Sequence, residues 1–537
     1  MSRSPPFTEQ SILPTRVAWP KSRGTVSAFT PSIPTRLHLD SITPGATGRT
    51  VLLDFGKELF GGVRFEVGAV ASGHRARLRV RLGESISEAL VGGFAERTLD
   101  VRSGQSVDGG VTGFRFACID LAEEATSAEL TGLRAYCVTR DLEYRGAFRC
   151  DDERLNRIWD VGVYTVHLCM QELLWDGVKR GRSVWAGDLY PAAAVVAAVF
   201  GDHSVVRDSL DHVRDRTLAG NPAEPDWMNG IPAYSLWWVI TQDEWYRHHG
   251  GTTYLAGQRE YLHRLLPLVF DHIDARGRER LDGWRFLDWA SVGDAATVHC
   301  GYQGLTAWAL RSAARLCAAA GEDELRDRCT ATLGSLARYR PSATRSEQAR
   351  ALMALGGVAR SDEPDREGPT RRPAVGLTPF LGYAVLEARA AAGDYAGSLD
   401  LIRAYWGAMI DLGATTFWED FDLGWVSGST GIDVVPDGRR DVHADFGRCT
   451  NSGLSQSLCH GWSAGPTAWL SRHVLGVRPV EPGHRVVRVR PHLGGLRWAE
   501  GTVPIPSGEI RVRHERRADG SIASAVDAPH KVQVIRS

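Results

Sequence analysis

The spacing of apolar residues changes twice along this 537-residue chain, and these changes limit the folds open to it. Up to about residue 143, short segments such as RARLRVRL (75–82) alternate apolar with charged residues, as half-buried strands do. From about 150, apolar residues recur at helical spacing, and from about 478 the strand pattern returns, as in EIRVRHE (509–515). The sequence therefore predicts an N-terminal β-sandwich (1–143), a helical domain (144–477) and a C-terminal β-sandwich (478–537).

The helical segment contains about a dozen candidate helices joined by loops, among them 204–218, 232–249, 254–274, 302–320 and 454–474. Helices in this number, paired by loops, can form a toroid of helical hairpins. A stacked solenoid is the alternative architecture, but the sequence has no fixed period to support it.

Composition excludes several classes of protein. A formal net charge of -1 gives no basic excess with which to neutralise phosphates, so no nucleic-acid partner is expected. No run of eighteen apolar residues predicts a membrane span, and the start of the chain lacks a signal-peptide pattern, so we expect a cytoplasmic protein. The nine cysteines form no CxxC pair, which predicts buried thiols, no metal site and no cofactor. The oligomeric state is left open.

Five segments between predicted helices combine tryptophan with Asp, Glu or His. Aromatic faces pack on the C–H faces of sugars, while carboxylates and guanidinium groups bond to hydroxyls. Cleavage of a glycosidic bond further needs two acidic groups. The five segments together therefore predict a carbohydrate site. They are DGVKRGRSVWAGD (176–188), EPDWMNGIPAYSLWW (224–238), FLDWASVGD (286–294), ATTFWEDFD (414–422) and LCHGWSAG (458–465).

The first of these segments resembles the catalytic stretch of the inverting α-L-rhamnosidases, glycoside hydrolase family 78, whose relatives have the pattern DGxKRDRxVWxGD. The segments GATTFWEDFD (413–422), SLCHGWSAGPTAWL (457–470) and 482–512 resemble further motifs of that family, in the same order along residues 50–530. The resemblance implies a central (α/α)6 barrel flanked by N-terminal and C-terminal β-sandwiches. It also implies an enzyme that releases a terminal α-L-rhamnose, or a related deoxy-sugar, from a small-molecule or oligosaccharide glycoside.

The resemblance also implies roles for single residues. Glu419 corresponds to the general base that activates water, and Asp176 and Asp188 correspond to carboxylates that hold the hydroxyls of the sugar. His460 corresponds to a histidine that bonds to the sugar, and Trp185 to a wall of the sugar pocket. The full set of expected substrate-binding residues is Arg180, Arg182, Trp185, Asp226, Trp238, Trp289, Trp418, His460 and Trp462.

The departure from the family pattern is Gly181, at the position of the general acid. Glycine has no proton to give, so three explanations are open. Another acid replaces it, from Asp176, Asp188, Glu224 or Asp226. Alternatively, the leaving group needs little protonation, since general acid catalysis typically contributes about 10²–10⁴-fold. In the third explanation the protein binds sugar without cleaving it, and another carbohydrate-active enzyme such as a lyase is a further alternative.

Overall fold

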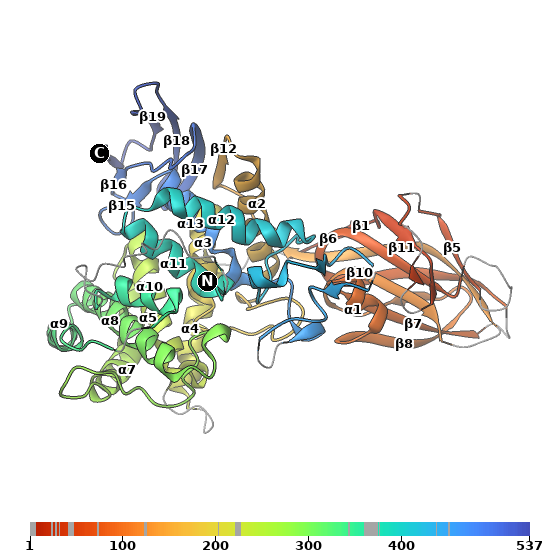
Figure 1. Cartoon of the computed structure of the whole chain (residues 1–537), viewed down its shortest axis with the longest axis horizontal. Coiled ribbons are helices and arrows are strands. Elements are labelled where there is room, and N and C mark those ends of the chain that lie inside the picture. The colour runs from red at the N-terminus through yellow and green to blue at the C-terminus, as the bar shows by residue number, and fades with distance from the viewer. Residues whose placement is uncertain are drawn as a thin grey trace.

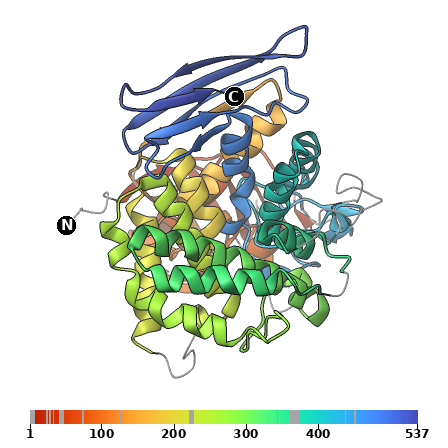
Figure 2. The ribbon, with the colours of Figure 1, turned by 90° about the vertical axis from the view of Figure 1, so that its left-hand side faces the viewer.

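The structure is a computed structural model in which three parts follow one another along the chain (Figure 1). An N-terminal β-domain lies at one end of the molecule and the helices at the other (Figure 1). The last strands lie across one side of the helices (Figure 2). The residues that the structure describes are 7–22, 25–26, 29–31, 33–40, 48–71, 75–122, 126–201, 203–220, 227–341, 344–358, 374, 376–435, 438–448 and 452–536.

The N-terminal β-domain is built on one nine-stranded sheet. Its main path runs β1 (Phe7–Ile12), β11 (Ser127–Arg140), β6 (Thr50–Val70), β10 (Thr112–Leu121), β7 (Arg75–Gly83) and β8 (Ala95–Arg102). Strands β2 (Arg16–Ala18) and β9 (Ser106–Asp108) pair with β6, and β5 (Arg36–Asp40) pairs with β11. β3 (Pro20–Ser22) and β4 (Thr25–Val26) pair separately, and helix α1 (Ile86–Val91) packs on β7 and β10.

The burial of these strands explains why the sequence pattern identified them. β7 alternates exposed and buried residues in its first half, as the sequence RARLRVRL requires for a sheet with one face in the core. β10 is buried along its whole length, which places it at the centre of the domain.

The helical domain contains α2 to α13. Their bounds are α2 (Glu153–Cys169), α3 (Leu189–Val199), α4 (Ser204–Leu218), α5 (Pro232–His249), α6 (Thr253–Ala256), α7 (Arg259–Asp271), α8 (Ala295–Ala320), α9 (Asp323–Leu336), α10 (Glu347–Gly356), α11 (Pro379–Ala391), α12 (Tyr395–Asp411) and α13 (Gly465–Trp469). Consecutive helices pack as hairpins, such as α8 with α9 and α11 with α12. A single π-helical turn, Leu470–Val474, continues α13.

Some helix bounds differ from those predicted. The candidate 254–274 is two helices, α6 and α7, separated at Gly257 and Gln258. α8 begins seven residues before the predicted 302, because Asp294 caps it by accepting from the backbone N–H of Thr297. The candidate 454–474 is helical only from Gly461 onwards apart from a short turn at Gly453–Ser455, since the segment before it crosses the site as extended chain.

The C-terminal β-domain has two sheets. One contains β15 (Val477–Pro479), β16 (Val486–Val489) and β20 (Gln533–Arg536), and the other contains β12 (Ala147–Cys150), β17 (Trp498–Ile505), β18 (Gly508–Arg516) and β19 (Ile522–Asp527). β12 precedes the helices in the chain but pairs with β17, so residues 147–150 belong to this sheet and not to the helical domain in which the prediction placed them.

The N-terminal β-domain contacts the loops of the helical domain directly. The backbone N–H of Gly113 donates to the carbonyl of Val178 at 3.1 Å, and that of Glu58 donates to Thr415 Oγ1 at 2.9 Å. Both acceptors lie in or next to segments in which the sequence predicts a carbohydrate site, so the β-domain supports that region. In the described part of the chain, no helix combines the length and apolar character that a membrane span needs.

Candidate active site

The segment 176–188 folds back on itself around the side chain of Asp176. The backbone N–H of Asp176 donates to the carbonyl of Ser183, and the N–H of Ser183 donates to Asp176 Oδ1, both at 3.0 Å. Between them the N–H of Arg182 donates to the carbonyl of Arg180 at 2.9 Å, which makes a tight turn with Gly181 at its centre. Gly181 has φ +73° and Arg182 has φ 50°, so the turn uses the left-handed region that favours glycine.

A second constraint requires glycine at position 181. A Cβ placed there would lie 2.2 Å from Asp176 Oδ2, far inside van der Waals contact. The Asp176 carboxylate therefore occupies the space in which a side chain of residue 181 would begin. This contact explains why the smallest residue stands at the centre of a segment rich in charged and aromatic side chains.

Backbone bonds bring the segment 458–465 against Asp176. The N–H of Gly461 donates to the carbonyl of Asp176 at 2.8 Å, and Gly177 forms an isolated β-bridge with His460. The N–H of His460 donates to the carbonyl of Phe417 at 2.9 Å, which adds the segment 414–422 to the same cluster. Three of the five segments that the sequence singled out thus meet at one place.

Asp188 lies directly before α3 and faces α5. Its Oδ1 accepts from Tyr234 Oη at 3.0 Å, and its Oδ2 lies 3.8 Å from His460 Nε2. Asp188 is 6% exposed, so its carboxylate has little contact with water. Tyr234 stands in the first turn of α5, so a fourth segment joins the cluster.

Glu419 is held by contacts on both its backbone and its side chain. Its N–H donates to the carbonyl of Ser457 at 2.9 Å, and its Oε2 accepts from the N–H of Ser457 at 3.1 Å. Arg180 Nη2 donates to the same oxygen at 2.5 Å, while Arg180 Nε donates to the carbonyl of Ser455 at 2.6 Å. Arg180 therefore links the turn at Gly181 to Glu419 through an ion pair.

The electrostatics of the cluster favour protons on the aspartates. Burial raises the pKa of Asp176 to about 7, and the nearby charge of Glu419 adds to this rise although the N–H of Ser183 opposes it. Burial and the charge of Asp176 raise the pKa of Asp188 well above its ordinary value. Burial lowers the pKa of His460, and the charge of Arg180 adds to that effect. Near neutral pH the cluster thus combines protonatable carboxyl groups and a neutral imidazole with a carboxylate paired to arginine.

Aromatic rings surround these carboxyl groups. Trp462 donates from Nε1 to the carbonyl of Glu419 at 3.0 Å, stacks on Phe380 with ring centroids 4.9 Å apart, and lies 4.5 Å from the ring of His460. Trp185 is partly exposed and meets Tyr234 edge to face at 5.9 Å. Of these two expected binding residues, Trp185 thus has a partly exposed ring beside the carboxyl groups, whereas Trp462 is 3% exposed and packs between Phe380 and His460.

Other expected binding residues take different places. Trp238 is fully buried and donates its indole N–H to the carbonyl of Leu210 at 3.1 Å, so it has no face to offer a ligand and is part of the helical core. Trp418 is 1% exposed and packs edge to face on Phe421. Arg182 donates to the carbonyls of Val178 and Val111, at 3.0 and 3.1 Å, and so ties the turn to the N-terminal β-domain.

The remaining two expected residues are Trp289 and Asp226. Trp289 is partly exposed and lies beside Phe286, with ring centroids 4.9 Å apart. Asp226, together with Glu224, lies outside the described residues.

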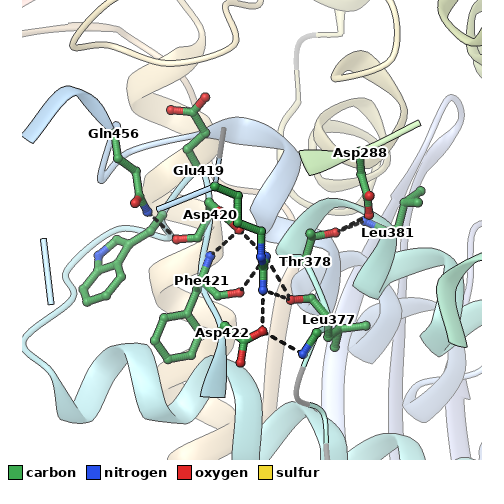
Figure 3. A network of polar contacts seen from close by, with 12 residues as sticks. Asp288, Leu377, Thr378, Leu381, Glu419, Asp420, Phe421, Asp422 and Gln456 are labelled. Carbon is green, nitrogen blue, oxygen red and sulfur yellow. Dashed lines mark hydrogen bonds and ion pairs between the residues drawn. The ribbon is translucent and has the colours of Figure 1, made fainter. Parts of the chain in front are cut away.

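An arginine-centred network supports Glu419 from behind, and the sequence analysis did not find it. Arg448 donates to Asp420 Oδ1 at 2.5 Å and also pairs with Asp422. Figure 3 shows the carboxyl group of Glu419 pointing away from this network, while Asp420 and Asp422 point into it. The acidic run of EDFD (419–422) was the available signal, but its arginine partner lies too far along the chain for spacing to identify it.

A second supporting cluster joins the two domains. Lys179, with a side chain 1% exposed, pairs with Glu88 at 2.7 Å and with Glu84 at 3.5 Å, both from the N-terminal β-domain. Glu84 Oε2 in turn accepts from the N–H of Leu458 at 2.6 Å. The lysine that follows Asp176 in the motif is therefore a buried structural ion, and it anchors the site to the β-domain.

Comparison with known proteins finds matches for two segments of this chain. Residues 143–333 match the bacterial alpha-L-rhamnosidase 6 hairpin glycosidase domain. Residues 476–535 match the bacterial alpha-L-rhamnosidase C-terminal domain. These segments are thus similar to two domains of bacterial α-L-rhamnosidases, in the same chain order as a helical domain followed by a β-domain. No protein of curated function matches the chain.

Solved structures of rhamnosidases are similar along most of this chain. A family 78 rhamnosidase of Bacillus sp. GL1 is 26% identical with a TM-score of 0.77, over 91% of this chain and 53% of that enzyme, so this chain spans about half of its length. A Klebsiella oxytoca rhamnosidase with rhamnose bound is 24% identical with a TM-score of 0.71, over 87% of this chain and 96% of that one. A Streptomyces avermitilis α-L-rhamnosidase complexed with L-rhamnose is 17% identical with a TM-score of 0.71, over 99% of this chain and 50% of that enzyme.

Proposed function

We propose that this protein hydrolyses a terminal α-L-rhamnoside, or the glycoside of a related deoxy-sugar, with inversion at the anomeric carbon. The observation that supports this most is the meeting of Asp176 and Asp188, from the segment 176–188, with Glu419, whose carboxylate is paired to Arg180. The rhamnose bound in the Klebsiella and Streptomyces enzymes supports the choice of sugar. We also infer that the helical hairpins close into an (α/α)6 barrel between two β-sandwiches.

In this mechanism Glu419 is the general base. The N–H of Ser457 and the guanidinium of Arg180 both hold Oε2, which orients the carboxylate. Glu419 removes a proton from water as the water attacks the anomeric carbon. An inverting enzyme needs this carboxylate about 6.5–9.5 Å from the acid, so that the water fits between base and sugar.

Asp176 is the general acid in place of the residue missing at position 181. Its Oδ2 stands against Gly181, and the N–H of Ser183 holds Oδ1, so the carboxyl group presents one oxygen toward the turn where the family has its acid. Burial keeps a proton on it near neutral pH, since its pKa is raised to about 7. Asp176 then protonates the leaving oxygen, while Asp188 with Tyr234 and His460 holds the hydroxyls of the sugar.

Non-catalytic sugar binding is the second candidate, and Gly181 is the observation that favours it. The two functions differ in a direct assay. The purified protein is incubated with 4-nitrophenyl α-L-rhamnoside and with an alkyl α-L-rhamnoside, and the anomer first released is followed by NMR. We expect the inverted sugar, and an at least about 100-fold loss of turnover in Glu419→Gln.

The matched control is Glu96→Gln, an exposed glutamate in β8 of the N-terminal β-domain. It should hydrolyse both substrates as the unchanged protein does. Full activity in Glu419→Gln would remove Glu419 from the mechanism. Binding of rhamnose without release of sugar from either substrate would establish the second candidate instead.

A further inference from the structure

Helices α3 and α5, which carry residues of the site at their N-terminal ends, also line a cavity. The cavity has a volume of about 270 Å³. Along α3 the cavity is lined by Tyr190, Ala193, Ala194 and residues 196–198, and at the end of α5 by His248 and His249. Asp176, Asp188, Tyr234, Glu419 and His460 do not line it, so the glycosidase reaction proposed above does not account for it.

Three histidines meet in the wall of this cavity. His203 precedes α4, and His248 and His249 end α5. When one ring nitrogen is taken from each histidine, the three nitrogens all lie within 4.8 Å of one another. Their ring centroids are 5.0 Å apart for His203 and His248, 4.9 Å for His203 and His249, and 4.6 Å for His248 and His249.

The hydrogen bonds of two of these rings determine where their protons lie. His203 Nε2 is 2.7 Å from the carbonyl oxygen of Phe200, and His249 Nδ1 is 3.1 Å from that of Trp245. A carbonyl oxygen can only accept, so both of these nitrogens carry the proton of the neutral imidazole. His203 Nδ1 and His249 Nε2, which face each other at 2.8 Å, are then both left with lone pairs. Two facing lone pairs repel unless a cation, either a proton or a metal ion, lies between them.

The third ring, that of His248, contributes a further nitrogen to the group. Nε2 of His248 is buried and has no hydrogen-bond partner among the residues that the structure describes. A divalent metal ion binds the lone pairs of neutral imidazoles, and one ion between these rings would remove the repulsion between His203 Nδ1 and His249 Nε2.

We propose that His203, His248 and His249 bind one divalent transition-metal ion of the zinc class. Three imidazole nitrogens suit Zn²⁺, which they bind at about 2.0–2.1 Å, and a fourth position open to the cavity would take water. Tetrahedral ligands at that distance lie about 3.3 Å apart, within the range that the three nitrogens already span. The site departs from the expectation of no metal, since its ligands are too far apart in sequence for their spacing to reveal them.

The position of the site indicates a structural role. The carbonyl of His248 accepts from His484 Nδ1 at 3.0 Å, and the carbonyl of Arg247 accepts from the N–H of Gly483 at 3.1 Å. His484 and Gly483 belong to the loop between β15 and β16 of the C-terminal β-domain. A metal ion here ties the end of α5 to the start of α4 next to the joint between two domains, and so stabilises that joint.

The test uses the full chain without a histidine tag, treated with EDTA and dialysed. Zn²⁺ is titrated by calorimetry, and Co²⁺ is titrated by absorption because tetrahedral cobalt gives a characteristic d–d spectrum. We expect one equivalent of either ion, a higher melting temperature with Zn²⁺, and binding at least about tenfold weaker in His248→Gln and in His249→Gln. His263→Gln is the matched control, since His263 is half-exposed on α7 and pairs with Glu322.

The outcome does not depend on the glycosidase activity, because stoichiometry, spectrum and melting temperature are the readouts. Absence of stoichiometric Zn²⁺ and Co²⁺ binding in the unchanged protein would overturn the proposal and leave a proton between His203 and His249. Equal binding in the three variants would overturn the assignment of the ligands. If the glutamine variants fail to fold, the cobalt spectrum of the unchanged protein still decides, because an octahedral spectrum contradicts a tetrahedral site of three histidines and one water.

Discussion

Asp176 Oδ2 lies 2.2 Å from the position that a Cβ on residue 181 would occupy, so the carboxylate and Gly181 share one space. The loss of an acidic side chain at 181 is therefore linked to the orientation of another acid, five residues earlier. Gly181 adopts φ +73° in this turn and has no side chain, so the backbone of the turn can approach the Asp176 carboxylate closely.

Gly181→Ala should lower turnover at least about tenfold and destabilise the fold by about 1–3 kcal/mol. The added methyl group collides with Asp176 and occupies a left-handed φ. Gly393→Ala is the matched control, since Gly393 has φ +84° with nothing within 4 Å of its Cβ position. Both variants are compared by melting temperature and by kcat/KM on an aryl rhamnoside. If both lose stability but neither loses activity, the contact with Asp176 has no part in catalysis.

The pH dependence of turnover tests the role of Asp176 as the acid. Because its pKa is about 7, the protonated form disappears as the pH rises through 7, and kcat/KM on an alkyl rhamnoside should fall over the same range. In Asp176→Asn, kcat/KM on the alkyl rhamnoside should be about 10²–10⁴-fold lower and should no longer fall as the pH rises through 7. The loss should be smaller on a nitrophenyl rhamnoside, whose leaving group needs little protonation. If kcat/KM of Asp176→Asn still fell over the same pH range, that fall would belong to the titration of another group.

The same raised pKa predicts a change in stability with pH. The unfolded chain releases the proton of Asp176 near pH 3.9, at about the ordinary pKa of aspartate, and the folded chain releases it at about 7. The folded protein binds more protons between these values, so its stability falls as the pH rises through this window. Asp176→Asn lacks this titration and should be the more stable protein above pH 7, by up to about 4 kcal/mol, with the difference vanishing near pH 4. Urea unfolding of both proteins from pH 4.5 to 8 measures it, and a constant difference would contradict the raised pKa.

The sequence predicted those features that depend on local pattern. The bounds of α4 (Ser204–Leu218) and α5 (Pro232–His249) are those predicted, because their apolar spacing ends where the helices end. The segments rich in tryptophan and acid also meet in part, as Asp176, Asp188 and Glu419 show. Local chemistry thus identified the elements and the segments of the site.

Contacts between distant segments were beyond that analysis. A tryptophan such as Trp238 is suited to the wall of a sugar pocket, and only the packing of α5 shows that this side chain faces the core. Arg448 and His203 each find their partners across long stretches of chain, and nothing in their own surroundings predicts which partner that is. Such pairs depend on how distant helices and loops pack together, and the spacing of residues within one segment does not predict that packing.

The buried lysine of the motif gives the last prediction. Lys179 is the cation beside Glu84 and Glu88, and burial raises the pKa of Glu84 to about 7 even with the lysine present, which opposes that rise. Lys179→Met leaves these buried carboxylates without their cation and should destabilise the protein by about 3–5 kcal/mol. The loss should be largest above pH 7 and smaller at lower pH, because protonated glutamates need no counter-charge.

Urea unfolding at pH 5.5 and 8 measures this effect, with Lys531→Met as a control at an exposed position. Adding Glu88→Gln to Lys179→Met removes one of the unpaired charges and should restore part of the lost stability, whereas Glu88→Gln alone should not stabilise the protein by as much. If Lys179→Met were as stable as the unchanged protein at pH 8, the two glutamates would be protonated in the absence of the lysine. In that case the anchoring of the site to the N-terminal β-domain would depend on hydrogen bonds such as that from the N–H of Leu458 to Glu84, and not on charge.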